Sequence, residues 1–409
     1  MTPAEMRAAG KLGGRAFAAM VSRVEQVHRA VADRASGRLH EADAPARAIH
    51  DAVSRGVYVA VRTVGAAAGA VGGQVASLLG AGDRPAGQAA GGHLALAAVA
   101  VVNAVAGDQL SPDLAPLTIR MAVRAGGRDV GLVTEELADA FPHATSRLAI
   151  FVHGLAETEI SWHRRAADHM PYGPQLHAGF GYTPLYLRYN TGRHVSDSGL
   201  DLAWLLEGLL ANWPEQVDDL LLVGHSMGGL VIRSACYYGS QAAAPWTERV
   251  RHIFYLGSPH LGAPLAGAAG FAGWALGKTP ETRPFATLVT GSGPGIKDLR
   301  HGYLLSGDWD GCDQDNCLAD HRDDVPLLAG ACHYAISATV TGDPGSPLGG
   351  LVGDLLVRPA SAQGGRARRQ HIPFSVEPGR GPGGMHHLDL LNHPAVWAAM
   401  RGVLGDARP

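Results

Sequence analysis

Ser226 stands between two glycines in the run Gly224-His225-Ser226-Met227-Gly228, a spacing that suits a nucleophilic serine. The four apolar residues 220–223 before it predict a buried strand, and the apolar stretch after it predicts a helix. Glycine on both sides allows a sharp strand-to-helix turn that exposes the hydroxyl. The backbone N–H of Met227, at the start of that helix, would point to where a tetrahedral oxyanion forms. The run therefore predicts attack by a serine on a carbonyl carbon.

The spacing alone is weak evidence for that chemistry. Of the 409 residues 55 are glycine, so chance would supply roughly a third of one Gly-x-Ser-x-Gly match. A serine nucleophile also needs a histidine base and a carboxylate that orients the base. The sequence offers candidates for both, downstream of the serine.

The base is expected in the Gly-rich segment Gly383-Gly384-Met385-His386-His387, which leads into an apolar helix. His387 is the preferred candidate, because apolar residues such as Leu390 would anchor the helix that follows it. His386 and His393 are the alternatives, and the two histidines that are not the base are expected to be ordinary loop residues.

The acid is expected after a late strand, predicted over residues 334–340. Asp343 comes sooner after this strand, but its neighbours are turn residues, where aspartate is common. Asp354 lies in the otherwise apolar stretch 351–357, where a partly buried carboxylate needs a partner. We therefore prefer Asp354, which gives the chain order serine, acid, histidine.

A second oxyanion donor is predicted at Leu155. It follows the buried strand expected over residues 148–152, in the sequence His153-Gly154-Leu155. Its backbone N–H would complete an oxyanion hole with that of Met227. His153 is interpreted as a structural hydrogen-bonding residue, since it directly follows a strand upstream of the nucleophile.

Strands alternate with helices from residue 113 onward, which predicts an α/β fold with a mostly parallel sheet covered on both faces. In such sheets the site lies at the carboxyl ends of the strands. The predicted strands are residues 117–123, 148–152, 184–189, 220–223, 252–256, 334–340 and 372–376, with helices at 135–141 and 202–211.

Residues 1–112 are predicted to form a helical subdomain that precedes a catalytic domain at 113–409. Apolar residues recur at helical spacing over 17–31 and 49–61. Residues 63–107 are nearly uncharged, but they are rich in Gly and Ala rather than in Leu and Ile, so a membrane hairpin is disfavoured. Contact of these N-terminal helices with a membrane surface is the alternative that we keep.

Composition excludes several classes of protein. A net charge of −3 gives no electrostatic footprint for nucleic acid. Four cysteines are too few for a disulfide framework, although Cys312 and Cys317 bracket a polar turn and could form a bridge. The first twenty residues lack a secretory signal, which favours a cytoplasmic location unless a leader has been removed.

Together these motifs resemble bacterial lipase- and esterase-type α/β-hydrolases, related to hydrolases similar to the GPI inositol-deacylase. The resemblance covers about residues 115–405. It rests on His153-Gly154-Leu155-Ala156-Glu157-Thr158-Glu159 with Trp162, Tyr189-Asn190-Thr191-Gly192-Arg193-His194, the Ser226 run, Gly257-Ser258-Pro259-His260-Leu261-Gly262, Gly295-Ile296-Lys297-Asp298-Leu299-Arg300 with Trp309, and the Asp354 and His387 stretches. It implies an α/β-hydrolase fold and hydrolysis of carboxylic esters without a metal or organic cofactor. It also supports Asp354 and His387 over their rivals.

A cap over the pocket is predicted within residues 263–300, with Phe271 and Trp274 lining a site for acyl or aromatic esters. Surface packing of this segment without substrate contact is the alternative. Seven aspartates between Asp308 and Asp324 raise the question of calcium, but Gly311 does not fall where an EF-hand needs it, so a solvated loop is preferred.

The predicted function is that of a serine esterase or lipase-like enzyme acting on a small-molecule, lipid or polymer ester. Two alternatives stay open. The first is an acyltransferase or thioesterase with the same three residues. The second is a non-catalytic protein of this fold that binds a lipid or protein partner.

Overall fold

The computed structural model describes residues 4, 7–8, 10–15, 96–97, 99–104, 107, 115–263, 293–311, 322–343, 346, 349–350, 353–365, 371–374 and 382–406. The chain divides into two compact units. The smaller comprises Met1–Ala95, Leu110–Thr118 and Leu276–Val289, and its described part includes the short 3-10 helix η2 (Ala115–Leu117). The larger comprises Leu96–Gln109, Ile119–Ala275 and Thr290–Pro409.

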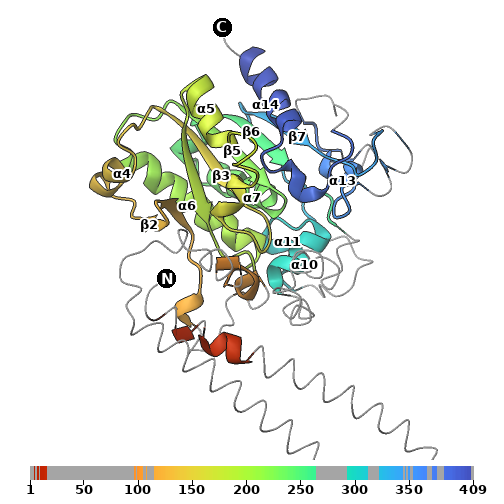
Figure 1. The fold of residues 1–409 in the computed structure, drawn as a ribbon, viewed down its shortest axis with the longest axis horizontal. Helices are drawn as coiled ribbons and strands as arrows, with labels where there is room; N and C mark the ends of the chain where they lie inside the picture. Colours follow the sequence, from red (N-terminus) through yellow and green to blue (C-terminus); the bar gives the residue numbers. More distant parts are fainter. Residues whose placement is uncertain are drawn as a thin grey trace, which may run out of the picture. The chain divides into compact units, whose positions relative to one another are not determined.

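The larger unit is built on one seven-stranded sheet, whose labelled strands are surrounded by helices in Figure 1. The strand order is β2-β1-β4-β3-β5-β6-β7. Strand β1 runs antiparallel to both of its neighbours, and the other neighbouring pairs are parallel. The strands are β1 (Ala122–Ala125), β2 (Arg128–Val130), β3 (Arg147–Val152), β4 (Thr183–Arg188), β5 (Asp219–His225), β6 (Val250–Leu256) and β7 (Cys332–Ile336).

Helices follow the strands in alternation. The α-helices are α4 (Thr134–Ala140), α5 (Tyr172–Phe180), α6 (Val195–Asn212), α7 (Met227–Gln241), α10 (Pro294–His301), α11 (Ser306–Trp309), α13 (Pro359–Ala362) and α14 (Pro394–Asp406). The 3-10 helices of this unit are η3 (Glu159–His163), η4 (Pro245–Arg249) and η6 (His387–Leu390). Within the described residues, no helix has the length and apolarity needed to span a bilayer.

The central strands are buried on both faces, which explains why their sequences are continuously apolar rather than alternating. Phe151, Val223 and Phe254 point to one face and share an apolar cluster with residues of α5 and α14. The alternate residues point to the other face. This core fixes the central strands rigidly, and the loops at their ends are therefore held in defined positions.

The carboxyl ends of four parallel strands are aligned. Val152 of β3 pairs with Gly224 of β5, His225 with Leu256 of β6, and Leu256 with Ile336 of β7. The loops that follow these strands therefore begin at the same edge of the sheet, as the sequence predicts for the site.

The α/β architecture and the central strands agree with the predictions, but two predicted strands are wrong. Residues 117–123 contain the end of η2, and β1 begins only at Ala122, where a Gly126-Gly127 turn pairs it with β2. Residues 372–374, the described part of the last predicted strand, are irregular. Pro373 lies in this segment and cannot donate to a strand ladder, and Phe374 N donates to Ile372 O in a tight turn.

Candidate active site

Ser226 occupies the bend between β5 and α7 in a strained backbone conformation, with φ 52° and ψ −120°. Non-glycine residues hold such angles only when the surrounding structure imposes them. Here Ser226 N donates to Leu256 O of β6 (2.8 Å), and Ser226 O accepts from Gly229 N (3.1 Å). The bend is therefore fixed from the neighbouring strand and from the helix that follows.

The glycines on either side of the serine serve close approach rather than conformational freedom. Gly224 and Gly228 both avoid positive φ, and the strain lies on the serine itself. A Cβ at Gly228 would lie 2.2 Å from Val152 O, and one at Gly224 would lie 2.6 Å from Gly229 Cα. This differs from the sequence-based expectation that the glycines would themselves supply the bend.

Asp354 and His387 form a buried pair. His387 Nδ1 donates to Asp354 Oδ2 at 2.6 Å, and each side chain is 1% exposed. The other carboxylate oxygen accepts from the backbone N–H groups of Leu356 and Val357, at 3.0 and 2.8 Å. These bonds fix the carboxylate, and through it they fix the tautomer of the ring, so that Nε2 carries the lone pair of the neutral imidazole.

The same pair changes the basicity of His387. Burial by itself disfavours the charged ring, but the charge and the hydrogen bond of Asp354 outweigh burial, so the pKa of His387 is raised above its ordinary value. A raised pKa makes the ring a better proton acceptor.

The ring of His387 lies beside the bend that carries the serine. Its centroid is 4.8 Å from that of His225, the residue before Ser226, and its Cε1 would be 3.0 Å from a Cβ at Gly257. Ser226 is 2% exposed, and its Oγ has no hydrogen-bond partner in the described part of the chain. The bond from serine to histidine is thus not formed here, and such bonds often tighten only when substrate binds.

The rival residues have other surroundings. Asp343 and His386 are exposed. His393 Nδ1 accepts from Ala395 N (3.2 Å) at the start of α14, and its own backbone N–H donates to Tyr172 Oη (2.7 Å). Of the two acids and three histidines considered, the structure pairs only Asp354 with His387.

The loop after β3 meets the serine from the other side. A Cβ at Gly154 would be 3.1 Å from Ser226 Cβ. Leu155 and Met227, whose N–H groups are the predicted oxyanion donors, are both buried at this junction. The two loops are therefore adjacent, as an oxyanion hole requires.

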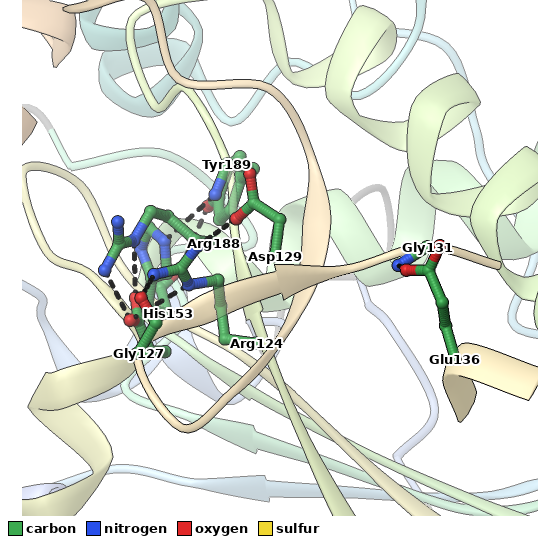
Figure 2. Close-up of polar contacts among 9 residues, drawn as sticks. Arg124, Gly127, Asp129, Gly131, Glu136, His153, Arg188 and Tyr189 are labelled. Carbon is green, nitrogen blue, oxygen red and sulfur yellow. Dashed lines mark hydrogen bonds and ion pairs between the residues drawn. The ribbon is translucent and has the colours of Figure 1, made fainter. Parts of the chain in front are cut away.

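His153 has a structural role. Its ring stacks on Tyr189 at 4.5 Å, Nε2 accepts from Tyr189 N (3.3 Å), and Nδ1 bonds Gly154 O (2.9 Å). Burial lowers the pKa of His153, so the ring stays neutral. Figure 2 shows His153 and Tyr189 bonded in this way, beside a cluster of arginines.

That cluster centres on Glu159, a residue of the motif after β3 to which the sequence alone assigned no role. Arg188 of β4 donates to it from Nε at 2.7 Å, and Arg124 of β1 donates from Nε at 3.3 Å. Burial by itself would raise the pKa of Glu159, but the two arginines outweigh it and lower the pKa. The carboxylate thus ties η3 to two strands. Its arginine partners lie 29 and 35 residues away in the chain, so the local sequence gives no signal of this.

Several predictions fall on residues that lie outside the described ranges. They are the cap residues Phe271 and Trp274, the cysteines Cys312 and Cys317, and the N-terminal helices at 17–31 and 49–61. The predicted membrane-surface contact of those helices therefore stays a prediction.

The aspartate-rich loop is partly described. Asp308 Oδ2 accepts from the backbone N–H groups of Leu304 and Leu305, and Oδ1 accepts from that of Asp323. This residue therefore caps the backbone. In the ranges given above, no group of His, Cys, Asp and Glu side chains is arranged to hold a metal ion.

Comparison with known proteins gives a partial family match and several similar structures. A model of the PGAP1-like alpha/beta domain matches residues 205–270, well under half of the chain. No match was found among curated proteins. The chain is 19% identical to the mature lipase BlEst2 of Bacillus licheniformis, with a TM-score of 0.42 over 63% of this chain and 91% of that one.

Two further structures are similar at the same level. Lipase B of Aspergillus fumigatus is 12% identical, with a TM-score of 0.39 over 72% of this chain and 58% of that one. YbtT, the type II thioesterase of the yersiniabactin biosynthetic pathway, is 15% identical, with a TM-score of 0.41 over 65% and 95%. The chemistry of the present site has to come from its own residues.

Proposed function

The chain has the α/β-hydrolase fold, and from this premise we propose that it is a serine hydrolase of carboxylic esters. The observation that carries the proposal is the buried Asp354–His387 pair beside the strained bend at Ser226. The serine is the nucleophile, the histidine is the general base and acid, and the aspartate holds the ring in place.

In the first half of the reaction, Ser226 Oγ attacks the ester carbonyl while His387 Nε2 takes the hydroxyl proton. The tetrahedral oxyanion accepts hydrogen bonds from the backbone N–H groups of Leu155 and Met227. The histidine then gives the proton to the leaving alcohol, and the acyl group remains on the serine.

In the second half, water replaces the alcohol. His387 takes a proton from the water, which attacks the acyl carbon, and the serine oxygen leaves with the proton that the ring returns. The carboxylic acid is released and the site returns to its starting state. Asp354 stabilises the charged ring in both halves, and its own proton count does not change.

The test combines labelling with turnover. The wild-type protein is expected to react covalently with a fluorophosphonate and to hydrolyse p-nitrophenyl esters. Ser226→Ala should lose both reactions and keep its fold, as judged by circular dichroism and thermal unfolding. Ester turnover retained by the folded variant would contradict the assignment. An acyl-thioester series and an added alcohol, assayed in parallel, separate ester hydrolysis from thioester hydrolysis and acyl transfer.

A further inference from the structure

A second histidine–carboxylate pair lies next to the first. His225 Nδ1 is 3.1 Å from Oε1 and 3.2 Å from Oε2 of Glu157. The His225 side chain is fully buried, and that of Glu157 is 12% exposed. Burial by itself would raise the pKa of Glu157, but the adjacent His225 lowers it, so the carboxylate is ionised.

The ring of His225 is bonded on both sides. Its Nε2 lies 3.3 Å from the backbone oxygen of His387. A carbonyl and a carboxylate are both hydrogen-bond acceptors, so each ring nitrogen of His225 faces an acceptor. Both nitrogens are thus engaged in contacts with other site loops. The ring holds its neighbours in place, and His387 remains the candidate for the base.

The pair contacts each of the three loops that form the site. Glu157 Oε2 also accepts from Gly154 N (3.0 Å), the residue before the predicted oxyanion donor Leu155. His225 adjoins Ser226 in sequence and reaches the backbone of His387. These contacts connect segments that are 68 and 162 residues apart in the chain.

We propose that Glu157 and His225 are positioning residues, which set the oxyanion donor Leu155 and the base His387 around Ser226 as one unit. This inference rests on the proposed function. Misplacement of catalytic groups by an ångström lowers turnover steeply, so the pair should act on kcat rather than on substrate affinity.

Glu159 provides a matched comparison. It lies two residues further along the chain, at the start of η3, and is also a buried, ionised glutamate, but its partners Arg124 and Arg188 belong to strands. Loss of its charge should weaken the fold and leave the geometry at Ser226 intact.

The experiment compares Glu157→Ala, Glu157→Gln and Glu159→Gln with the wild type in p-nitrophenyl ester hydrolysis. Glu157→Ala should lower kcat about 10- to 100-fold and change KM by less than about threefold. Glu157→Gln should recover most of this loss. Its amide oxygen can accept from Gly154 N, and its NH2 can donate to Nδ1 of a neutral His225, whose Nε2–H still reaches His387. Glu159→Gln should lower Tm and leave kcat within about twofold of wild type.

A double variant tests whether the two residues act as a unit. Glu157→Ala/His225→Ala should lose about as much kcat/KM as either single variant, because non-additive losses mark a shared role. The double variant also leaves no unpaired buried charge, so it keeps the test open if Glu157→Ala fails to fold.

The proposal is overturned if folded Glu157→Ala has the kcat of the wild type or is changed only in KM. It is also overturned if Glu157→Gln is no more active than Glu157→Ala, or if the double variant loses the product of the two single-variant losses in kcat/KM. Failure of the proposed function looks different, because the wild-type protein itself would then neither react with the fluorophosphonate nor hydrolyse esters.

Discussion

The two histidine–carboxylate pairs of this site are neighbours, yet they are bonded differently. Asp354 binds Nδ1 of His387 and leaves Nε2 to carry the lone pair of the neutral ring. The ring of His225 is held at both nitrogens, by Glu157 and by the backbone of His387. The residue next to the serine in sequence is therefore the worse base. A histidine is therefore not identified as the general base by its closeness to the serine in sequence. It is identified by how its two ring nitrogens are hydrogen-bonded.

Replacing His387 and His225 separately by alanine should give the largest difference in kcat between the two pairs. His387→Ala removes the base and is expected to lower kcat by on the order of 10⁵-fold. His225→Ala removes only support and is expected to cost about 10- to 100-fold. Steady-state kinetics on folded variants check this, with fluorophosphonate labelling rates as a second readout. Equal losses at the two positions would break the comparison.

The same amide substitution should act very differently in the two pairs. In Asp354→Asn the new NH2 donates to Nδ1, which moves the ring proton to Nε2 and leaves no base, so kcat should fall about 10⁴-fold. Glu157→Gln, which makes the same change in the other pair, should lose far less. A loss of similar size in both variants would show that charge, rather than the tautomer, governs the site.

The pH profile tests the basicity of His387. Its pKa is raised by Asp354 against the effect of burial, and the ring acts as a base only when neutral. Activity should therefore be lost as pH falls, about tenfold per unit in kcat/KM, with a midpoint above the ordinary histidine pKa of about 6.5. The midpoint is read from kcat/KM between pH 5 and 9. A midpoint below the ordinary value would contradict the geometry of the pair.

The packing behind His387 can be tested with a smaller change. Gly257 has φ 63°, and a Cβ there would lie 2.7 Å from Leu390 Cδ1 and 3.0 Å from His387 Cε1. Gly257→Ala should lower kcat about 10- to 50-fold by displacing the ring. Gly181→Ala is the control, since Gly181 has φ 73° at the end of α5 but nothing within 4 Å of its Cβ position. Both variants should lose stability, and only the first should lose activity.

Local sequence was enough to predict the central strands and the bend at Ser226. Each is a short apolar run bounded by turn residues, and burial on both faces leaves such a run few alternatives. The hairpin of β1 and β2 was missed because its strands are short and polar and are defined by pairing with each other and with β4. Residues 372–374 were wrongly predicted as a strand, because Phe374 packs on Tyr255 and His260 without its backbone joining the sheet.

Part of the candidate site could also be predicted from local sequence, and part of it could not. The apolar setting of Asp354 and the loop around His387 indicated two partners, and the structure brings these two together at 2.6 Å. The ion-pair partners of Glu157 and Glu159 could not be predicted, since they lie 29 to 68 residues away and no spacing rule connects them. Long-range ion pairs of this kind become visible only when the sheet topology is known.

The strained backbone of Ser226 sets thermodynamic stability against catalysis at a single position. Glycine adopts φ 52° without penalty, so Ser226→Gly should raise the free energy of unfolding by about 1 kcal/mol over that of Ser226→Ala. Urea denaturation of the two inactive variants measures this difference, and equal midpoints would mean that the bend stores no such energy. Selection for thermodynamic stability alone would thus replace the serine by glycine. Selection for catalytic turnover is what retains a hydroxyl at this position.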